Sequence, residues 1–266
     1  MNKNKNIRKR FDFAILILAI LVFIVAGINI ILSLLKYKAG RDAYNGLSDK
    51  YVSVNDDSSE SETVESSTDN TDESWYTDIS IDFHALEEVN DEIIGWIRFD
   101  DGSIDYPLLK TDDNEKYLTY GADLNTNVSG AIFVDCACAN PFEDYYTIIY
   151  GHNMRDGSMF GKLKKLASDV DYLDENRYFT VYTASHAYRY RIFALYTVSA
   201  DNEMIYRVGF TDNDEYAKLI DYMISSSSYF FDELPDKNSK IITLSTCSGE
   251  TNRFIVNAYE SDRYDY

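Results

Sequence analysis

The chain has 266 residues, enough for one sizeable domain with appended segments. Its 45 acidic side chains outnumber the 25 basic ones and give a formal net charge of −20, which argues against nucleic acid as a partner because phosphate binding depends on Lys and Arg. Its 23 tyrosines favour a β-rich domain, since aromatic side chains suit the half-buried surface of a sheet.

The cysteines exclude two structural roles. Cys136, Cys138 and Cys247 are an odd, small set that provides no disulfide framework. No Cys or His spacing typical of a zinc site is present. We therefore expect no metal and no organic cofactor, and a lone cysteine with an upstream histidine stays a candidate nucleophile.

The first 35 residues have the pattern of an uncleaved signal-anchor. Residues 1–11 form a basic tail, and we expect a transmembrane helix over 12–35 because the chain carries no charge from Phe13 to Leu35. Such a run can cross a hydrocarbon core of about 30 Å as a helix. Because basic residues favour the cytoplasmic side, the sequence predicts a single-pass membrane protein with a cytoplasmic N-terminus. A buried hairpin helix of a soluble protein is the alternative.

Residues 36–78 are predicted to be an acidic, flexible linker. From about Asp42 to Asp78 the chain is rich in Ser, Thr, Asp, Glu and Asn and has almost no apolar periodicity. Such a segment cannot bury enough surface to offset the entropy lost on ordering. We therefore expect a self-repelling stalk that carries an extracellular folded domain over 79–266.

The domain is predicted to be mainly β, a closed barrel of about eight strands. Apolar runs bounded by turn residues predict strands at 93–99, 104–109, 130–135, 145–152, 178–183, 187–200, 240–247 and 253–260. Helical spacing of apolar residues predicts an N-terminal helical segment and other helices at 81–90, 113–120, 160–167 and 212–230. The last helix is inserted before the final two strands. Mostly antiparallel strands with a few peripheral helices are typical of a closed or nearly closed barrel.

The final hairpin places a thiol beside a guanidinium. A loop over 248–252 separates Cys247 from Arg253, and the residues that flank such a loop lie opposite each other, with Cβ atoms about 4.5–5.5 Å apart. A nearby cation favours the reactive thiolate, and a guanidinium can also stabilise the oxyanion formed when a thiolate attacks an amide. From position alone, a buried cysteine and a solvated arginine are the alternative.

His152 is the candidate proton carrier. It follows Gly151 at the end of an apolar strand, where scaffolds commonly present reactive groups. An imidazole can take or give a proton near neutral pH. His84 lies in the first helical segment and His186 at the polar start of a strand, and we expect ordinary, partly exposed roles for both. From position alone, His152 too could be an ordinary loop residue.

Two segments resemble motifs of a known family. TLSTC at Thr243–Cys247, followed by the arginine that opens the last strand, resembles the sortase signature. IIYGHNMRDGSMFGKL at Ile148–Leu163 closely resembles the histidine segment of class B sortases. The similarity extends over most of Ile79–Tyr259 and includes the helix inserted around 214–225, which is characteristic of class B. The N-terminal anchor agrees independently.

The resemblance implies a cysteine transpeptidase with a sortase-like barrel. Sortases recognise a short sorting motif near the C-terminus of a secreted protein, cleave it after a threonine through a thioacyl-enzyme, and pass the product to an amine. Cys247 would be the nucleophile, His152 would carry the proton, and Arg253 would hold the carbonyl and its developing charge. The implied partners are secreted proteins with a sorting motif and an amine of the cell-wall peptidoglycan.

The resemblance also implies four substrate-binding residues. Asn114 and Leu118 in DNEKYL, and Ser245 in TLSTC, match positions that line the class B substrate groove. Tyr206, before the inserted helix, is expected in the same wall, with its alignment open by one residue. Core packing is the alternative for Leu118 and Tyr206.

Other readings stay open at this stage. The loop after Cys247 is shorter than in many class B enzymes, and Ser248 stands where these enzymes often have an acid, with Glu250 the nearest one, so the motif and acceptor are undetermined. The alternatives are a pilin-polymerising sortase that uses a lysine amine, a cysteine peptidase or hydrolase, and a non-catalytic membrane-tethered binding domain. A papain-like order is disfavoured, because there the nucleophile precedes the histidine.

Overall fold

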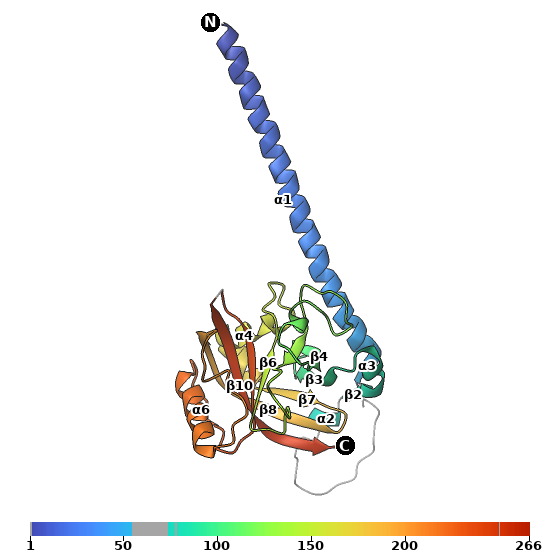
Figure 1. Ribbon diagram of the computed structural model, residues 1–266, viewed down its shortest axis with the longest axis vertical. Coiled ribbons are helices and arrows are strands. Elements are labelled where there is room, and N and C mark those ends of the chain that lie inside the picture. Colours follow the sequence, from blue (N-terminus) through green and yellow to red (C-terminus); the bar gives the residue numbers. More distant parts are fainter. Residues whose placement is uncertain (1, 55–73, 78, 250) are drawn as a thin grey trace.

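Eight strands form a closed barrel in the computed structural model, which describes residues 2–54, 74–77, 79–249 and 251–266 (Figure 1). The strands follow one another around the barrel in the order β10-β8-β7-β3-β4-β5-β6-β9, and β9 pairs with β10 to close it. The neighbours pair antiparallel, except for β4 with β5 and β6 with β9, which are parallel. The predicted fold class is confirmed.

The strands of the barrel lie close to the predicted segments. Their bounds are β3 Ile93–Phe99, β4 Asp105–Leu109, β5 Ile132–Val134, β6 Tyr146–Tyr150, β7 Tyr178–Tyr182, β8 His186–Ser199, β9 Ile241–Cys247 and β10 Asn252–Asp265. A separate two-stranded ribbon, which was not predicted, consists of β1 Val52–Val54 and β2 Ile79–Ile81.

The helices lie around the barrel. Their bounds are α1 Asn2–Tyr51, α2 Ser74–Thr77, α3 Phe83–Val89, η1 Lys116–Leu118, η2 Phe160–Lys162, α4 Leu163–Ser168, α5 Val170–Glu175 and α6 Asn213–Ser226. The inserted helix α6 begins where the Asp212 carboxylate accepts hydrogen bonds from the backbone N–H groups of Asp214 and Glu215. It then packs Tyr216 and other apolar side chains against the barrel.

The alternation along β6 and β9 defines an inner and an outer face. Ile149 and Leu244 belong to the main core, whereas Ile148 and Ile241 belong to a second cluster that packs against α6. Successive side chains of a strand point to opposite faces. The end of β9 therefore presents Cys247 on the outer face, on the same side as α6.

The helix α1 continues past the predicted anchor and packs on the barrel (Figure 1). Gly40, Tyr44 and Leu47 are buried, and their i, i+4, i+7 spacing places them on one face of the helix. The first part of the flexible linker predicted over 36–78 is therefore helical and docked. The sequence did not indicate this, because the apolar stripe is short and lies among polar residues, so no apolar periodicity is evident. The acidic remainder of that linker, 55–73, lies outside the described residues.

The helix α1 also includes a segment that is long and apolar enough to cross a membrane, as judged by length and composition. The 50 residues of the helix would extend for about 75 Å at the usual rise per residue. This agrees with a membrane anchor near the N-terminus.

Docking of α1 predicts a measurable contribution to stability. Leu47 is 8% exposed, so Leu47→Ala should reduce the free energy of unfolding by about 2–4 kcal/mol, because it removes buried methyl groups and leaves a cavity. Denaturant unfolding of the full chain in detergent micelles, followed by near-UV circular dichroism, measures this. Asn45→Ala, on the exposed side of the same helix, is the matched control and should leave the midpoint unchanged. Equal midpoints for both variants would show that α1 does not belong to the folded unit.

Candidate active site

Three neighbouring strands bring Cys247, Arg253 and His152 to one end of the barrel. Arg253 lies directly opposite Cys247 in the β9–β10 pair, as the loop length predicts. In the parallel β6–β9 pair Tyr150 lies opposite Ser245, so His152 follows beside Cys247 two residues further along. Residues two apart on a strand share a face. All three side chains therefore belong to the outer face.

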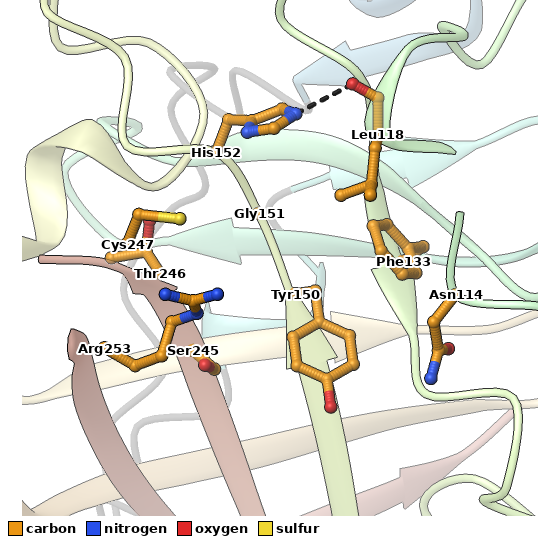
Figure 2. A pocket seen from close by; sticks show the side chains of 10 residues that line it. All are labelled: Asn114, Leu118, Phe133, Tyr150, Gly151, His152, Ser245, Thr246, Cys247 and Arg253. Carbon is orange, nitrogen blue, oxygen red and sulfur yellow. Dashed lines mark hydrogen bonds between the residues drawn. The ribbon is translucent and has the colours of Figure 1, made fainter. Parts of the chain in front are cut away.

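These three side chains line one pocket, of about 230 Å³ (Figure 2). Its other lining residues are Asn114, Leu118, Phe133, Tyr150, Gly151, Ser245 and Thr246. Figure 2 shows Cys247 and Arg253 on one side of the pocket and Asn114 on the other. A carbonyl group of a ligand in the space between them would lie near the thiol.

Cys247 is a free thiol at the edge of the pocket. The side chain of Asn153 donates a 2.8 Å hydrogen bond to the backbone carbonyl of Cys247, which ties the loop after β6 to the end of β9. The guanidinium of Arg253 donates to the carbonyl of Asn252 at 3.0 Å, and Figure 2 shows it next to Cys247. A carbonyl oxygen of a substrate between them would meet both the nucleophile and a fixed positive charge.

His152 is held by a backbone carbonyl on the far side of the pocket. Its Nε2 lies 2.8 Å from the carbonyl oxygen of Leu118 (Figure 2). A carbonyl can only accept, so Nε2 carries the hydrogen. In the neutral imidazole, Nδ1 is then the basic nitrogen. The ring can therefore accept a proton at Nδ1 while the bond to Leu118 fixes its orientation.

The remaining cysteines and histidines do not line this pocket. Cys138 is buried, and burial raises the pKa of its thiol to about 11, which disfavours the thiolate. Cys136 contributes its backbone N–H to Asn114 Oδ1, at 2.8 Å. His84 lies on α3, and His186 lies at the start of β8, where its Nε2 is 3.4 Å from Asp265.

The substrate side of the pocket is built on one buried carboxylate. Asp135, which is 7% exposed, accepts hydrogen bonds from Asn114 Nδ2 at 3.1 Å and from the Tyr150 hydroxyl at 2.7 Å. Burial, followed by the bond to Asp135, raises the pKa of Tyr150, so this phenol keeps its proton and donates. Asp135 therefore fixes the orientation of two pocket side chains.

The structure places the four predicted substrate-binding residues around the pocket. Asn114, Leu118 and Ser245 line it. Leu118 is 42% exposed, which argues against simple core packing. Tyr206 lies behind the lining, where its hydroxyl is 3.0 Å from Ser245 Oγ and its ring stacks near Tyr150 at 6.3 Å between centroids. Glu250 lies outside the described residues.

Several residues that line or support the pocket were not singled out from the sequence. Tyr150 stands two residues before His152 and shares its face, so strand alternation alone could have identified it. Phe133 lies opposite Tyr150 in the β5–β6 pair. Asp135 and Asn153 act through hydrogen bonds to residues distant in sequence, and no local pattern indicates them.

Comparisons with known proteins agree on one family. A sortase-domain family model matches residues 97–261. Sortase B of Listeria monocytogenes is 35% identical over 62% of this chain and 66% of its own length, and sortase B of Staphylococcus aureus is 25% identical over 93% and 95%. A crystal structure of sortase B from B. anthracis in complex with AAEK1 has a TM-score of 0.68 and 28% identity, covering 85% of this chain and 98% of that one.

These similarities extend through the barrel, the inserted helix and all three strands that meet at the pocket. Sortases are cysteine transpeptidases that sort proteins to the cell wall. The chain therefore belongs to the sortase family, and within it to class B.

Proposed function

We propose that the protein cleaves a C-terminal sorting motif of secreted proteins after a threonine and transfers them to an amine of the cell-wall peptidoglycan. The single observation that carries this proposal is the convergence of Cys247, Arg253 and the His152 segment on one pocket. They come from adjacent strands and share one face. Nucleophile, cation and proton carrier would then be within reach of one peptide bond.

In the first half-reaction, the Cys247 thiol passes its proton to Nδ1 of His152, and the resulting thiolate attacks the carbonyl carbon of the threonine. The carbon–sulfur bond forms, and the carbonyl oxygen gains negative charge that the guanidinium of Arg253 stabilises. The carbon–nitrogen bond then breaks, and the leaving amine takes a proton from His152. The product is a thioacyl-enzyme at Cys247, a covalent step that divides one difficult transfer into two easier ones.

In the second half-reaction, an acceptor amine attacks the thioester carbon. His152 takes the proton that the amine loses, and Nδ1 is suited to this because Nε2 is occupied by Leu118. The new amide forms as the sulfur of Cys247 leaves. The imidazolium then returns this proton to the departing sulfur, so the Cys247 thiol and the neutral imidazole are restored and the cycle balances.

The proposal includes a location. The basic residues before the apolar part of α1 favour a cytoplasmic N-terminus, which would put the barrel on the extracellular face with its substrates. We propose residues 1–11 as the cytoplasmic tail and 12–35 as the single transmembrane span. The catalytic unit would comprise 79–266 together with the docked end of α1, whose Tyr44 is buried in its core.

The test is to incubate the full chain in detergent micelles with a library of sorting-motif peptides and a set of amines. We expect a mass increase on Cys247 equal to the peptide up to its threonine, and release of that acyl group onto an added amine. Adducts confined to Cys136 or Cys138 would contradict the site assignment. Release only to water, whatever amine is present, would instead favour a hydrolase.

A further inference from the structure

We infer that Tyr44, on the docked part of α1, is a positioning residue for His152. The inference rests on the proposed function only in that it takes His152 as the proton carrier. The structural coupling between the two residues can be measured without any reaction. Its consequence is that the membrane-anchoring helix takes part in arranging the active site.

The first contact joins α1 to the segment before β5. The hydroxyl of Tyr44 donates a 2.5 Å hydrogen bond to the backbone carbonyl of Gly130. Tyr44 is 4% exposed, and its ring meets the ring of Tyr106 edge-on at 5.3 Å and 88°. The ring thus holds the side chain in the core, and the hydroxyl makes a specific contact beyond packing.

The second contact joins Gly130 to the imidazole. Gly130 has φ +54°, and a Cβ added there would lie 2.9 Å from Cδ2 of His152 and 2.4 Å from the carbonyl oxygen of Tyr117. Only a residue without a side chain allows the backbone to approach so closely. The peptide that Tyr44 holds is therefore one wall of the space that the His152 ring occupies.

The third contact joins the same wall to the hydrogen-bond partner of His152. The backbone N–H of Ala131 donates to Tyr117 at 2.9 Å, and that of Asn127 donates to Thr119 at 2.8 Å. These bonds bracket Leu118, whose carbonyl accepts from Nε2 of His152. A displacement of Gly130 would therefore move both the wall beside the imidazole and the acceptor that orients it.

The helix also contacts the chain that follows His152. Arg41 lies 3.6 Å from Asp156 in an ion pair. The hydroxyl of Tyr106, against which Tyr44 packs, accepts a hydrogen bond from the backbone N–H of Met159 at 3.0 Å. Met159 in turn forms a β-bridge with Asn153. Residues of α1 are thus connected both to Gly130, which lies beside the imidazole, and to the chain that follows His152.

The alternative is that Tyr44 is only a core residue that holds α1 on the barrel. Removal of the hydroxyl group alone distinguishes the two roles. Tyr44→Phe keeps the ring against Tyr106 and removes the hydroxyl, with its bond to the Gly130 carbonyl and its backbone contact with Ala122. Tyr51→Phe is the matched control, because it also removes a tyrosine hydroxyl from this helix. The Tyr51 hydroxyl accepts a hydrogen bond from Lys50 and does not contact Gly130.

The experiment uses the full chain in detergent micelles, with ¹³C-labelled histidine. The His152 resonance is assigned from its absence in His152→Ala. We expect Tyr44→Phe to shift this resonance, with those of His84 and His186 unchanged. With a sorting-motif peptide, kcat should fall by about threefold to tenfold at constant KM, the effect of one lost hydrogen bond. Tyr51→Phe should match the wild type in both measurements.

A His152 resonance in Tyr44→Phe that coincides with the wild type would overturn the inference. An equal shift in Tyr51→Phe would also overturn it, because the effect would then be general to the helix. A wild-type chain that forms no adduct with any peptide would contradict the proposed function instead. The resonance would still decide whether Tyr44 positions the imidazole.

Discussion

Cys247→Ala should abolish both the thioacyl adduct and transfer to an amine, with a loss of at least about 10⁴-fold, while the barrel keeps its stability. In the proposed mechanism the sulfur forms the covalent bond to the substrate, and the hydroxyls of Ser245 and Thr246, which also line the pocket, are much weaker nucleophiles than a thiolate. Removal of a covalent nucleophile typically leaves only the residual effect of binding and electrostatics. The measurement is single-turnover mass spectrometry of the full chain with a peptide that labels the wild type.

Cys136→Ser provides the matched control for this loss. Cys136 is another free, partly buried cysteine, and its described contacts to Asn114 and Lys110 use only its backbone. We therefore expect it to retain the wild-type rate. Transfer by Cys247→Ala at a rate near the wild type, or loss of the adduct in Cys136→Ser alone, would contradict the assignment of the nucleophile.

Local sequence patterns were sufficient for most of the barrel. The strands β3 and β9 lie where short apolar runs between turn residues predict them. The loop between Cys247 and Arg253 is short enough to determine which residues face each other, so this pair could be predicted as well. In both cases the information lies within a few residues of the feature that it determines.

Pairings between distant segments could not be derived in the same way. The parallel contact of β6 with β9 brings Tyr150 beside Ser245 across 95 positions, and no local pattern encodes which strands become neighbours in a barrel. The position of His152 next to Cys247 was therefore available only through resemblance to a family. The role of Asp135 as a shared acceptor for Asn114 and Tyr150 depends on the same long-range pairing.

The docking of α1 illustrates a second limit of prediction from the sequence. The segment after the apolar run is rich in polar residues, like the acidic stretch that follows, but it also has four basic side chains and three tyrosines, which that stretch lacks. A single stripe of this segment, Gly40, Tyr44 and Leu47, is buried in the folded domain. Composition averages over such a stripe, whereas tertiary contacts give it a fixed place.

His152→Ala should lower the rate of transfer by about 10²–10⁴-fold, the usual contribution of a positioned acid–base group. Without the imidazole the leaving amine must depart without a proton, so formation of the adduct should slow first. The folded state should persist, because His152 is only partly buried and its hydrogen bond goes to a single carbonyl. Single-turnover rates and unfolding midpoints, measured on the full chain, check both statements.

His152→Gln separates the two roles that the geometry gives this side chain. A glutamine amide can donate to the carbonyl of Leu118, as Nε2 does, but it cannot carry a proton between amines. If proton transfer is the role, Gln should be nearly as slow as Ala, and added imidazole should speed both variants. A transfer rate of the Gln variant close to that of the wild type would mean that His152 acts by holding Leu118 in its place in the pocket lining. The proton carrier would then have to be another group.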